Sequence, residues 1–123
     1  MAMKTEPRGG FNFGWNYGEN GWNSGMDANF LRLGRFGFHL SIKDRDLTAP
    51  PASPAAGDTY IPAAGATGAW AGLDGRVVVW VPGSPAGAWV SATPRLGWVA
   101  YVEDEEKLTA YKEAGWSARS EER

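Results

Sequence analysis

Two hydrophobic periods occur along this chain, and each predicts a different kind of element. The first is helical, because three apolar residues are spaced at i, i+4 and i+7: Met26, Phe30 and Leu33. Ser24 and Asp27 have the spacing of a capping box, so we predict a helix of about ten residues that begins at Ser24 and stops at Gly34. An isolated helix of this length is marginal in water, so its apolar stripe is expected to dock on another surface.

The second period is two, which is typical of amphipathic strands. Residues 36–42 alternate apolar and polar side chains and are predicted to form one strand. From Gly57 onward, short apolar runs are separated by Gly, Pro and Asp, a pattern typical of antiparallel hairpins. Asp74-Gly75 is expected to close one of these hairpins, and the acidic turn 103–106 another. The predicted strands of this region are 58–62, 68–73, 76–81, 88–92, 98–102 and 108–111.

The aromatic residues of these hairpins form an internal repeat. Trp70, Trp80 and Trp89 correspond to Trp98, Tyr111 and Trp116 at offsets of 28, 31 and 27 residues. A unit of this size cannot bury its own aromatic face, so the two units should stack on each other or on neighbouring chains. The predicted fold class is therefore mainly β: a small antiparallel β module of two hairpin repeats, preceded by an extended aromatic arm with one short helix.

Composition divides the chain into four segments. We expect an N-terminal arm with the short helix over residues 1–48, a Pro/Ala-rich hinge over 49–56, the β-hairpin-repeat module over 57–116 and a charged tail over 117–123. The three prolines of the hinge favour extended polyproline geometry. Such a stretch acts as a semi-rigid spacer, so it would hold the arm and the module apart.

The arm is rich in aromatic residues that alternate with Gly and Asn: Phe11, Phe13, Trp15, Tyr17 and Trp22. This stretch is too rich in Gly for a central strand and too aromatic for a solvated tail. Exposed aromatic clusters usually mark an interface, so docking on another protein is one interpretation. The other interpretation is that these rings fold back onto the β module.

Composition and charge exclude several classes of protein. The chain has 123 residues, which suggests one domain with an arm, and its net charge of −2 gives no basic surface for nucleic acid or an anionic membrane. The longest apolar run, 77–81, is far shorter than the roughly 20 residues of a membrane span. The chain has no cysteine, and its first residues lack the apolar segment of a secretory signal. We therefore expect a soluble protein made in the cytoplasm.

The sequence predicts no enzyme and no catalytic, cofactor or metal site. His39 is the only histidine, so it cannot form a histidine metal cluster and has no evident orienting group for base catalysis. The acidic run 103–106 does not place two carboxylates across a cleft, as glycoside hydrolysis requires, and it lacks the spacing of a calcium loop. We interpret it, and the charged run 43–46, as solvated turns.

Stacking on aromatic faces is the one binding chemistry that the sequence offers. Four tryptophans of the β module could stack on the sugar rings of glycans: Trp70, Trp80, Trp89 and Trp98. The alternative is that the same residues form the core. Seven Trp stand in a chain with few other large apolar residues, so the core interpretation is favoured.

Three stretches carry a family resemblance: LTAPPASPAAGDTYI, GATGAWAG and TPRLGWVAYVEDE. They resemble a small domain of unknown function found in tail-fibre-like proteins of bacteriophages, prophages and gene-transfer-agent particles. The resemblance runs from about Asp44 to Trp116, although the ending 111–116 departs from that of the family, so the last hairpin is expected to close differently. The earlier stretch GENGWNSGMDANFLRLG is similar to anchor segments of phage fibres and spikes.

The resemblance implies a structural virion component, namely a tail fibre, spike or fibre adaptor, that is made in the host cytoplasm and incorporated into the particle. Its expected partners are other virion structural proteins and further copies of itself, as a homotrimer. The alternative function is a carbohydrate-binding module that recognises host surface glycans. The residues expected to dock on the virion are Phe11, Phe13, Trp15, Tyr17, Trp22, Met26, Phe30 and Leu33.

Overall fold

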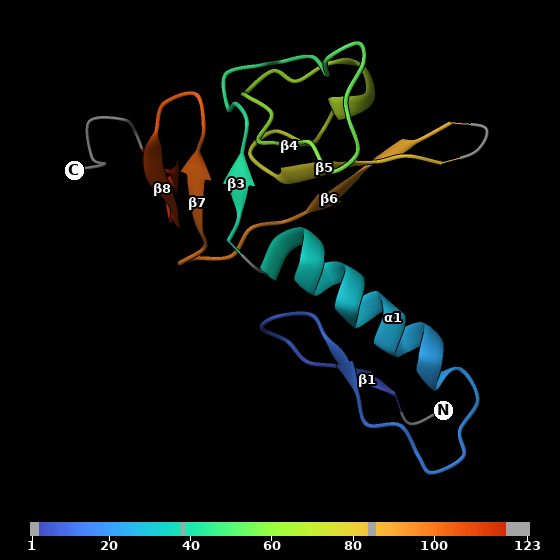
Figure 1. Cartoon of the computed structure of the whole chain (residues 1–123). Helices are drawn as coiled ribbons and strands as arrows, with labels where there is room; N and C mark the ends of the chain where they lie inside the picture. Colours follow the sequence, from blue (N-terminus) through green and yellow to red (C-terminus); the bar gives the residue numbers. More distant parts are fainter. Residues whose placement is uncertain (1–2, 38, 84–85, 118–123) are drawn as a thin grey trace. The chain divides into compact units, whose positions relative to one another are not determined.

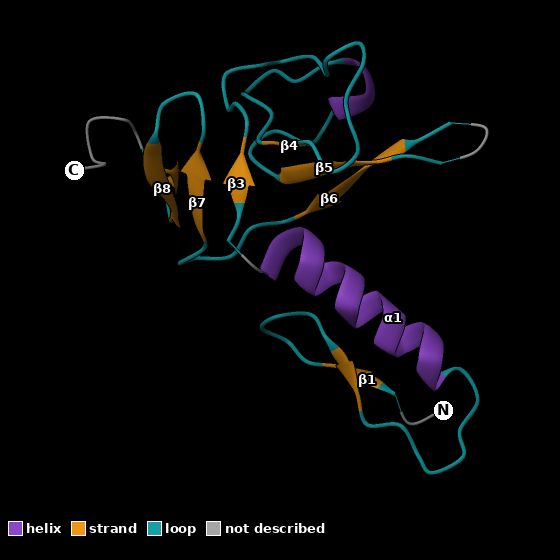
Figure 2. Cartoon of the chain, in the orientation of Figure 1, coloured by secondary structure: helices purple, strands orange, loops and turns teal. Residues whose placement is uncertain are grey.

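The computed structural model describes residues 3–37, 39–83 and 86–117 (Figure 1), so most of the expected charged tail lies outside the described residues. The chain forms two compact units, with the boundary between residues 38 and 39. It is mainly β with one α-helix, as the sequence predicts (Figure 2). The boundary falls earlier than the expected joins near residues 48 and 57.

The first unit is a small hairpin followed by a helix. Strands β1 (Lys4–Thr5) and β2 (Asn12–Phe13) pair antiparallel, and helix α1 (Trp22–Arg32) continues into the π-helical turn η1 (Leu33–Gly37). Glu6 closes the hairpin turn: its N–H donates to the carbonyl of Phe11 at 2.8 Å, and its carboxylate accepts the N–H of Arg8 at 2.9 Å. The hydrogen bond from Arg8 lowers the pKa of Glu6. The aromatic arm is therefore a folded unit.

Helix α1 begins two residues before the predicted start. Its N-cap is Gly21, which has a φ of 89°, and no side chain caps the helix. Ser24 lies inside the helix, so the capping-box prediction is wrong. Gly34 does not end the helical segment either, because η1 runs on to Gly37. A glycine N-cap gives a weaker sequence signal than a serine, which explains the misplaced boundary.

The second unit contains two antiparallel β-meanders. Strands β4 (Thr59–Tyr60), β5 (Val77–Val81) and β6 (Ala88–Ala92) form the first. Strands β7 (Val99–Val102), β8 (Lys107–Lys112) and β9 (Gly115–Trp116) form the second. The predicted pairing of 98–102 with 108–111 across the acidic turn is confirmed, and so is the strand 88–92.

A short strand, β3 (Ser41–Ile42), connects the two meanders. It pairs parallel to β7, and Figure 1 shows β7 between it and β8. The next residues bond to the other meander, because Lys43 N–H donates to the carbonyl of Thr59 at 2.8 Å and Ile61 N–H donates to that of Asp44 at 3.2 Å. The strand predicted over 36–42 is thus mostly wrong: its start is π-helical, residue 38 lies outside the described residues, and only two residues are in the sheet.

The segment 68–73 is not the predicted strand. It contains a 3₁₀ turn, η2 (Gly68–Trp70), and the backbone of Trp70 bonds only locally, to Thr67 and Leu73. Strand β5 therefore pairs with β4 instead of with this segment. Asp74-Gly75 is no type I′ turn, because only Gly75 has a positive φ. The turn places the indole of Trp70 in the core, where it is fully buried.

A buried cluster of the second unit packs against the first meander. Trp70, Tyr60 and Val78 form one buried cluster, and Ile42 and Val102 are also fully buried. Trp116 links the meanders, since its Nε1–H donates to the carbonyl of Gly75 at 2.7 Å. This bond joins the two hairpin units within a single chain, and the expected stacking of their aromatic faces on each other stays a prediction.

The proline-rich segment 49–56 packs on the β unit instead of forming a spacer. Pro50, Pro51 and Pro54 are half-buried and line a groove with two tryptophans of the hairpin β5–β6. Backbone hydrogen bonds hold both ends of the segment, from Thr67 to Thr48 and from Gly57 to Trp80. These bonds and contacts place the segment within the second unit.

Candidate functional site

Helix α1 uses one face to hold the N-terminal hairpin. The side chain of Asn29 bonds to both backbone groups of Asn12: its carboxamide oxygen accepts the N–H at 2.6 Å, and its nitrogen donates to the carbonyl at 2.9 Å. One turn earlier, Gly25 is buried against the ring of Trp15. A Cβ at Gly25 would lie 2.2 Å from that ring, so glycine is required for this close approach.

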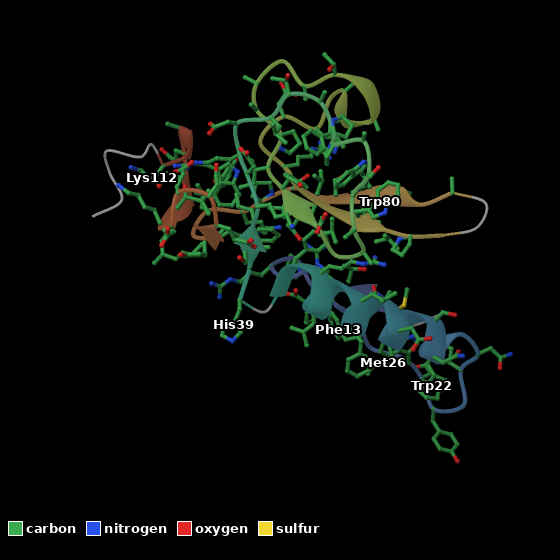
Figure 3. All side chains as sticks on the ribbon, turned by 45° about the horizontal axis from the view of Figure 1, so that its top comes forward. Phe13, Trp22, Met26, His39, Trp80 and Lys112 are labelled. Carbon is green, nitrogen blue, oxygen red and sulfur yellow. The ribbon has the colours of Figure 1, made fainter. Side chains whose placement is uncertain are left out.

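The adjacent face of α1 is apolar and partly exposed. Trp22, Met26, Phe30 and Leu33 follow one another at intervals of four, four and three residues, and we call these four residues the helix stripe. Trp22 is 57% exposed and Phe30 64% exposed, while Met26 and Leu33 are half-buried. Figure 3 shows Trp22 and Met26 on the helix and Phe13 on the hairpin. The stripe that the sequence predicts is therefore present and accessible.

The other residues expected to dock on the virion divide into two groups. Phe13 and Tyr17 are exposed, so they can contact a partner. Phe11 and Trp15 are half-buried, and the ring of Trp15 packs on Gly25 of the helix. Trp15 Nε1 has no hydrogen-bond partner among the described residues. Trp15 therefore holds the hairpin to the helix, a role that its sequence context did not indicate.

The aromatic residues of the second unit form one cluster. The ring of Trp70 lies 5.5 Å from that of Tyr60 and 5.3 Å from that of Trp89, and Trp89 lies 5.2 Å from Trp80. Trp70 is fully buried, so it belongs to the core, whereas Trp80, Trp89 and Trp98 are half-buried. Of the four tryptophans considered for glycan stacking, Trp70 is inaccessible.

Each meander carries an aromatic pair in the same backbone environment. The backbone N–H and carbonyl of Trp80 bond to residues 58 and 57. Trp80 therefore makes no backbone hydrogen bond to Trp89, the residue opposite it on β6. Tyr111 likewise bonds to Trp98 and Gly97, so its pair with Trp116 is also non-hydrogen-bonded. Side chains approach most closely in such pairs, and the ring centroids are 5.2 Å apart in both. The predicted correspondence of these four residues is confirmed.

A groove of about 480 Å³ lies beside the first of these pairs. Trp80 and Trp89 form one part of its lining, and Pro50, Pro51 and Pro54 another. The planes of the two indoles are inclined by 59°, so they do not form one flat platform. The groove is predominantly apolar, which suits a hydrophobic or ring-shaped ligand.

A buried ion pair holds the second meander to the segment before β4. The guanidinium of Arg45 makes two bonds to the carboxylate of Glu105, at 2.8 and 2.9 Å, and the two side chains are only 10% and 7% exposed. Arg45 also donates to Thr109 Oγ1 at 3.0 Å and to the carbonyl of Ser117 at 2.8 Å. The interpretation of 43–46 and 103–106 as solvated turns is therefore wrong for these two residues.

Three carboxylates converge next to this ion pair. Single oxygens of Asp44, Asp46 and Asp104 lie within 4.8 Å of one another. Burial, together with the charges of Asp44, Glu105 and Asp46, raises the pKa of Asp104. Oxygen ligands of this kind suit hard cations, but exposed acidic groups commonly lie together without one.

Residues 27–117 match a family described as a protein of unknown function, DUF2793. The match covers 91 of the 123 residues, since 117 − 27 + 1 = 91. The chain belongs to the DUF2793 family. Neither a curated protein nor a solved structure matches this DUF2793 chain. Among the described residues, no helix of this DUF2793 protein is long and apolar enough to cross a membrane.

The match divides the candidate surfaces of the DUF2793 protein. The aromatic cluster, the groove and the Arg45–Glu105 ion pair all lie within it. The helix stripe crosses its start, because Phe30 and Leu33 lie inside the match while Trp22 and Met26 precede it. The N-terminal hairpin therefore lies outside the region that this DUF2793 chain shares with the family.

Proposed function

We propose that this chain is a structural component of a bacteriophage or phage-like particle, and that it binds a neighbouring virion protein through the helix stripe. The resemblance of its sequence to tail-fibre domains and fibre anchor segments supports the proposal that the chain is part of such a particle. The absence of a histidine, cysteine or serine constellation for catalysis in the sequence agrees with a structural role. The β unit would then be the part that the docked chain presents.

The exposed helix stripe is the observation that carries this proposal. The hairpin contacts the face of α1 that bears Gly25 and Asn29, whereas Trp22 and Phe30 of the stripe stay more than half exposed. Trp22 and Phe30 lie one turn before and one turn after Met26. The exposure of two such large aromatic side chains to water is unfavourable. Amphipathic helices bind partners by laying residues of this spacing into an apolar groove, so the partner surface should be a hydrophobic groove.

Particle incorporation tests the proposal. We expect the double variant Trp22→Ser/Phe30→Ser to be lost from particles purified from cells that produce this chain, with a decrease of at least about tenfold relative to wild type. Hot-spot aromatic residues dominate such interfaces, which is why two substitutions suffice. The chain in the particles would be quantified by immunoblot against a major structural protein.

Two control variants separate docking from folding. Leu31→Ser removes a residue that is 51% exposed but lies outside the stripe, so incorporation should be retained. Trp15→Ala should loosen the first unit, because the Trp15 ring fills the space beside Gly25, and circular dichroism would detect this change. Wild-type incorporation of the folded double variant would refute docking by the stripe.

Glycan binding is the second candidate function, and the groove beside Trp80 and Trp89 favours it. Half-buried indoles at a groove can stack on sugar rings. Titration of host surface glycans should then change tryptophan fluorescence in the wild-type chain and not in Trp89→Ala. If the glycans cause no change in the wild-type chain, this alternative fails, while docking by the stripe is unaffected.

A further inference from the structure

One face of the hairpin β7–β8 is apolar and exposed. Along the two strands, Ala100, Val102 and Thr109 are buried, whereas Val99 is 52%, Tyr101 39% and Leu108 59% exposed. The register pairs Val99 with Ala110 and Tyr101 with Leu108, and we call these four residues the outer patch. A hollow of about 370 Å³ extends the patch toward β3, where Leu40 and Ser41 line it.

Residues of opposite charge flank the outer patch at its two ends. Glu103 lies two residues beyond Tyr101, and its carboxylate accepts a hydrogen bond from Ser41 Oγ at 2.7 Å. This bond holds Glu103 on the outer face, because Ser41 lies beside Tyr101 in the register. Lys112 lies two residues beyond Ala110, on the same face by strand alternation. At about 3.4 Å per residue, each charge is roughly 10 Å from the centre of the patch.

We propose that the outer patch is the contact between two copies of this chain, related by a two-fold axis that runs across the strands. Such an axis reverses the strand direction, so β7 lies over the partner's β7 and β8 over the partner's β8. Tyr101 then lies over the partner's Val99, and Leu108 over the partner's Ala110. Each large side chain thus faces a smaller one, the arrangement that packs two sheets about 10 Å apart.

The same operation makes the charges complementary. Glu103 and Lys112 are equally far from the axis on opposite sides, so the axis brings each Glu103 beside the partner's Lys112. Two ion pairs therefore close the two ends of the apolar contact. A copy related by a three-fold axis along the strands would instead bring like charges together, which is unfavourable. The match in size and in charge identifies a second copy, in antiparallel orientation, as the occupant of this face.

The size of the patch sets the strength of the dimer. Stable interfaces bury about 1,600 Å² in total, and a contact built on four residues with two flanking charges falls below that. The dimer should therefore be weak, reversible and sensitive to ionic strength, because its ion pairs are at the rim. This inference does not depend on the proposed virion function, since it involves a different surface and a different partner.

Sedimentation velocity of the full chain over a range of concentrations tests the dimer. We expect a reversible monomer–dimer equilibrium in the wild type, and only monomer in Leu108→Glu at the same concentrations. Leu96→Glu is the matched control, because Leu96 is 63% exposed but lies outside the outer patch, and it should dimerise like the wild type. A wild type that is monomeric at every concentration, or that is a trimer, overturns the proposal.

Charge reversal tests the orientation without relying on a core substitution. Glu103→Lys alone and Lys112→Glu alone should each raise the dissociation constant by about tenfold, because each creates a like-charge contact. The double reversal restores opposite charges and should restore the wild-type dissociation constant. If the double reversal dimerises no better than the single variants, the antiparallel arrangement is wrong.

Discussion

At the scale of single residues, Arg45 does the most to connect distant parts of the chain. It bonds to Glu105, Thr109 and Ser117, which lie 60 to 72 residues away in the sequence. The sequence offered no signal for this contact, because Arg45 stands in a run of charges that is typical of a solvated turn. A buried guanidinium needs several acceptors, and only the fold brings them together.

Removal of Arg45 should destabilise the second unit strongly. Arg45→Met leaves the buried Glu105 carboxylate without its ion-pair partner, so we expect a loss of about 3–5 kcal/mol in the free energy of unfolding. Chemical denaturation measures the loss. The double variant Arg45→Met/Glu105→Leu should recover much of it, since no buried charge remains. If Arg45→Met costs no more than a surface substitution, the ion pair is not buried in solution.

Asp104 gives a prediction on the effect of pH. Its pKa is raised in the folded state, so the folded chain holds this proton more tightly than the unfolded chain does. The contribution of Asp104 to the free energy of unfolding is therefore lost as the pH rises from the ordinary pKa of an aspartate through the raised pKa of the folded state. Asp104→Asn should be more stable than wild type at pH 7, by on the order of a few tenths of a kcal/mol because the site is solvated.

The pH dependence of the Asp104→Asn effect provides the check. The difference from wild type should vanish at low pH, where Asp104 is protonated in both the folded and unfolded states. Glu113→Gln removes one negative charge from an exposed position and serves as the comparison. Thermal unfolding at several pH values measures both variants, and a destabilised Asp104→Asn at pH 7 would contradict the account.

At the scale of elements, local pattern predicted hairpins well and turns poorly. The strand 88–92 and the hairpin of β7 and β8 follow from period-two alternation between turn residues, because both partners are close in sequence. The segment 68–73 has similar composition but forms a 3₁₀ turn that buries Trp70, a tertiary contact that periodicity does not show. The parallel pairing of β3 with β7 joins residues about 60 positions apart, which no local pattern indicates.

The helix was easier to predict than its surroundings. The spacing of Met26, Phe30 and Leu33 indicated an apolar stripe, and in the structure Phe30 is exposed while Met26 and Leu33 are half-buried. The second face was missed because it is formed by a glycine and an asparagine, Gly25 and Asn29. Both residues are ordinarily poor helix formers. Here they stabilise the unit through their contacts with Trp15 and Asn12.

At the scale of the whole molecule, the sequence predicted a β-rich chain with a helical N-terminal part, but not its division. The boundary between the compact units lies between residues 38 and 39, and the prolines at 50, 51 and 54 pack on the β unit. The family match extends from Asp27 to Ser117, so it covers the described part of the β unit and only part of the first unit. We therefore propose that the chain docks on the particle through the helix stripe, of which the family match includes only Phe30 and Leu33.

Site-specific crosslinking from the helix stripe tests this central claim most directly. A photoreactive amino acid at position 30, introduced into the full chain in cells that produce particles, should form an adduct with one virion structural protein in the purified particles. Mass spectrometry would identify that protein. The same reagent at Leu47, which lies in the β unit, should not form this adduct. Particles that contain the chain but show no adduct from position 30 would contradict docking by the stripe.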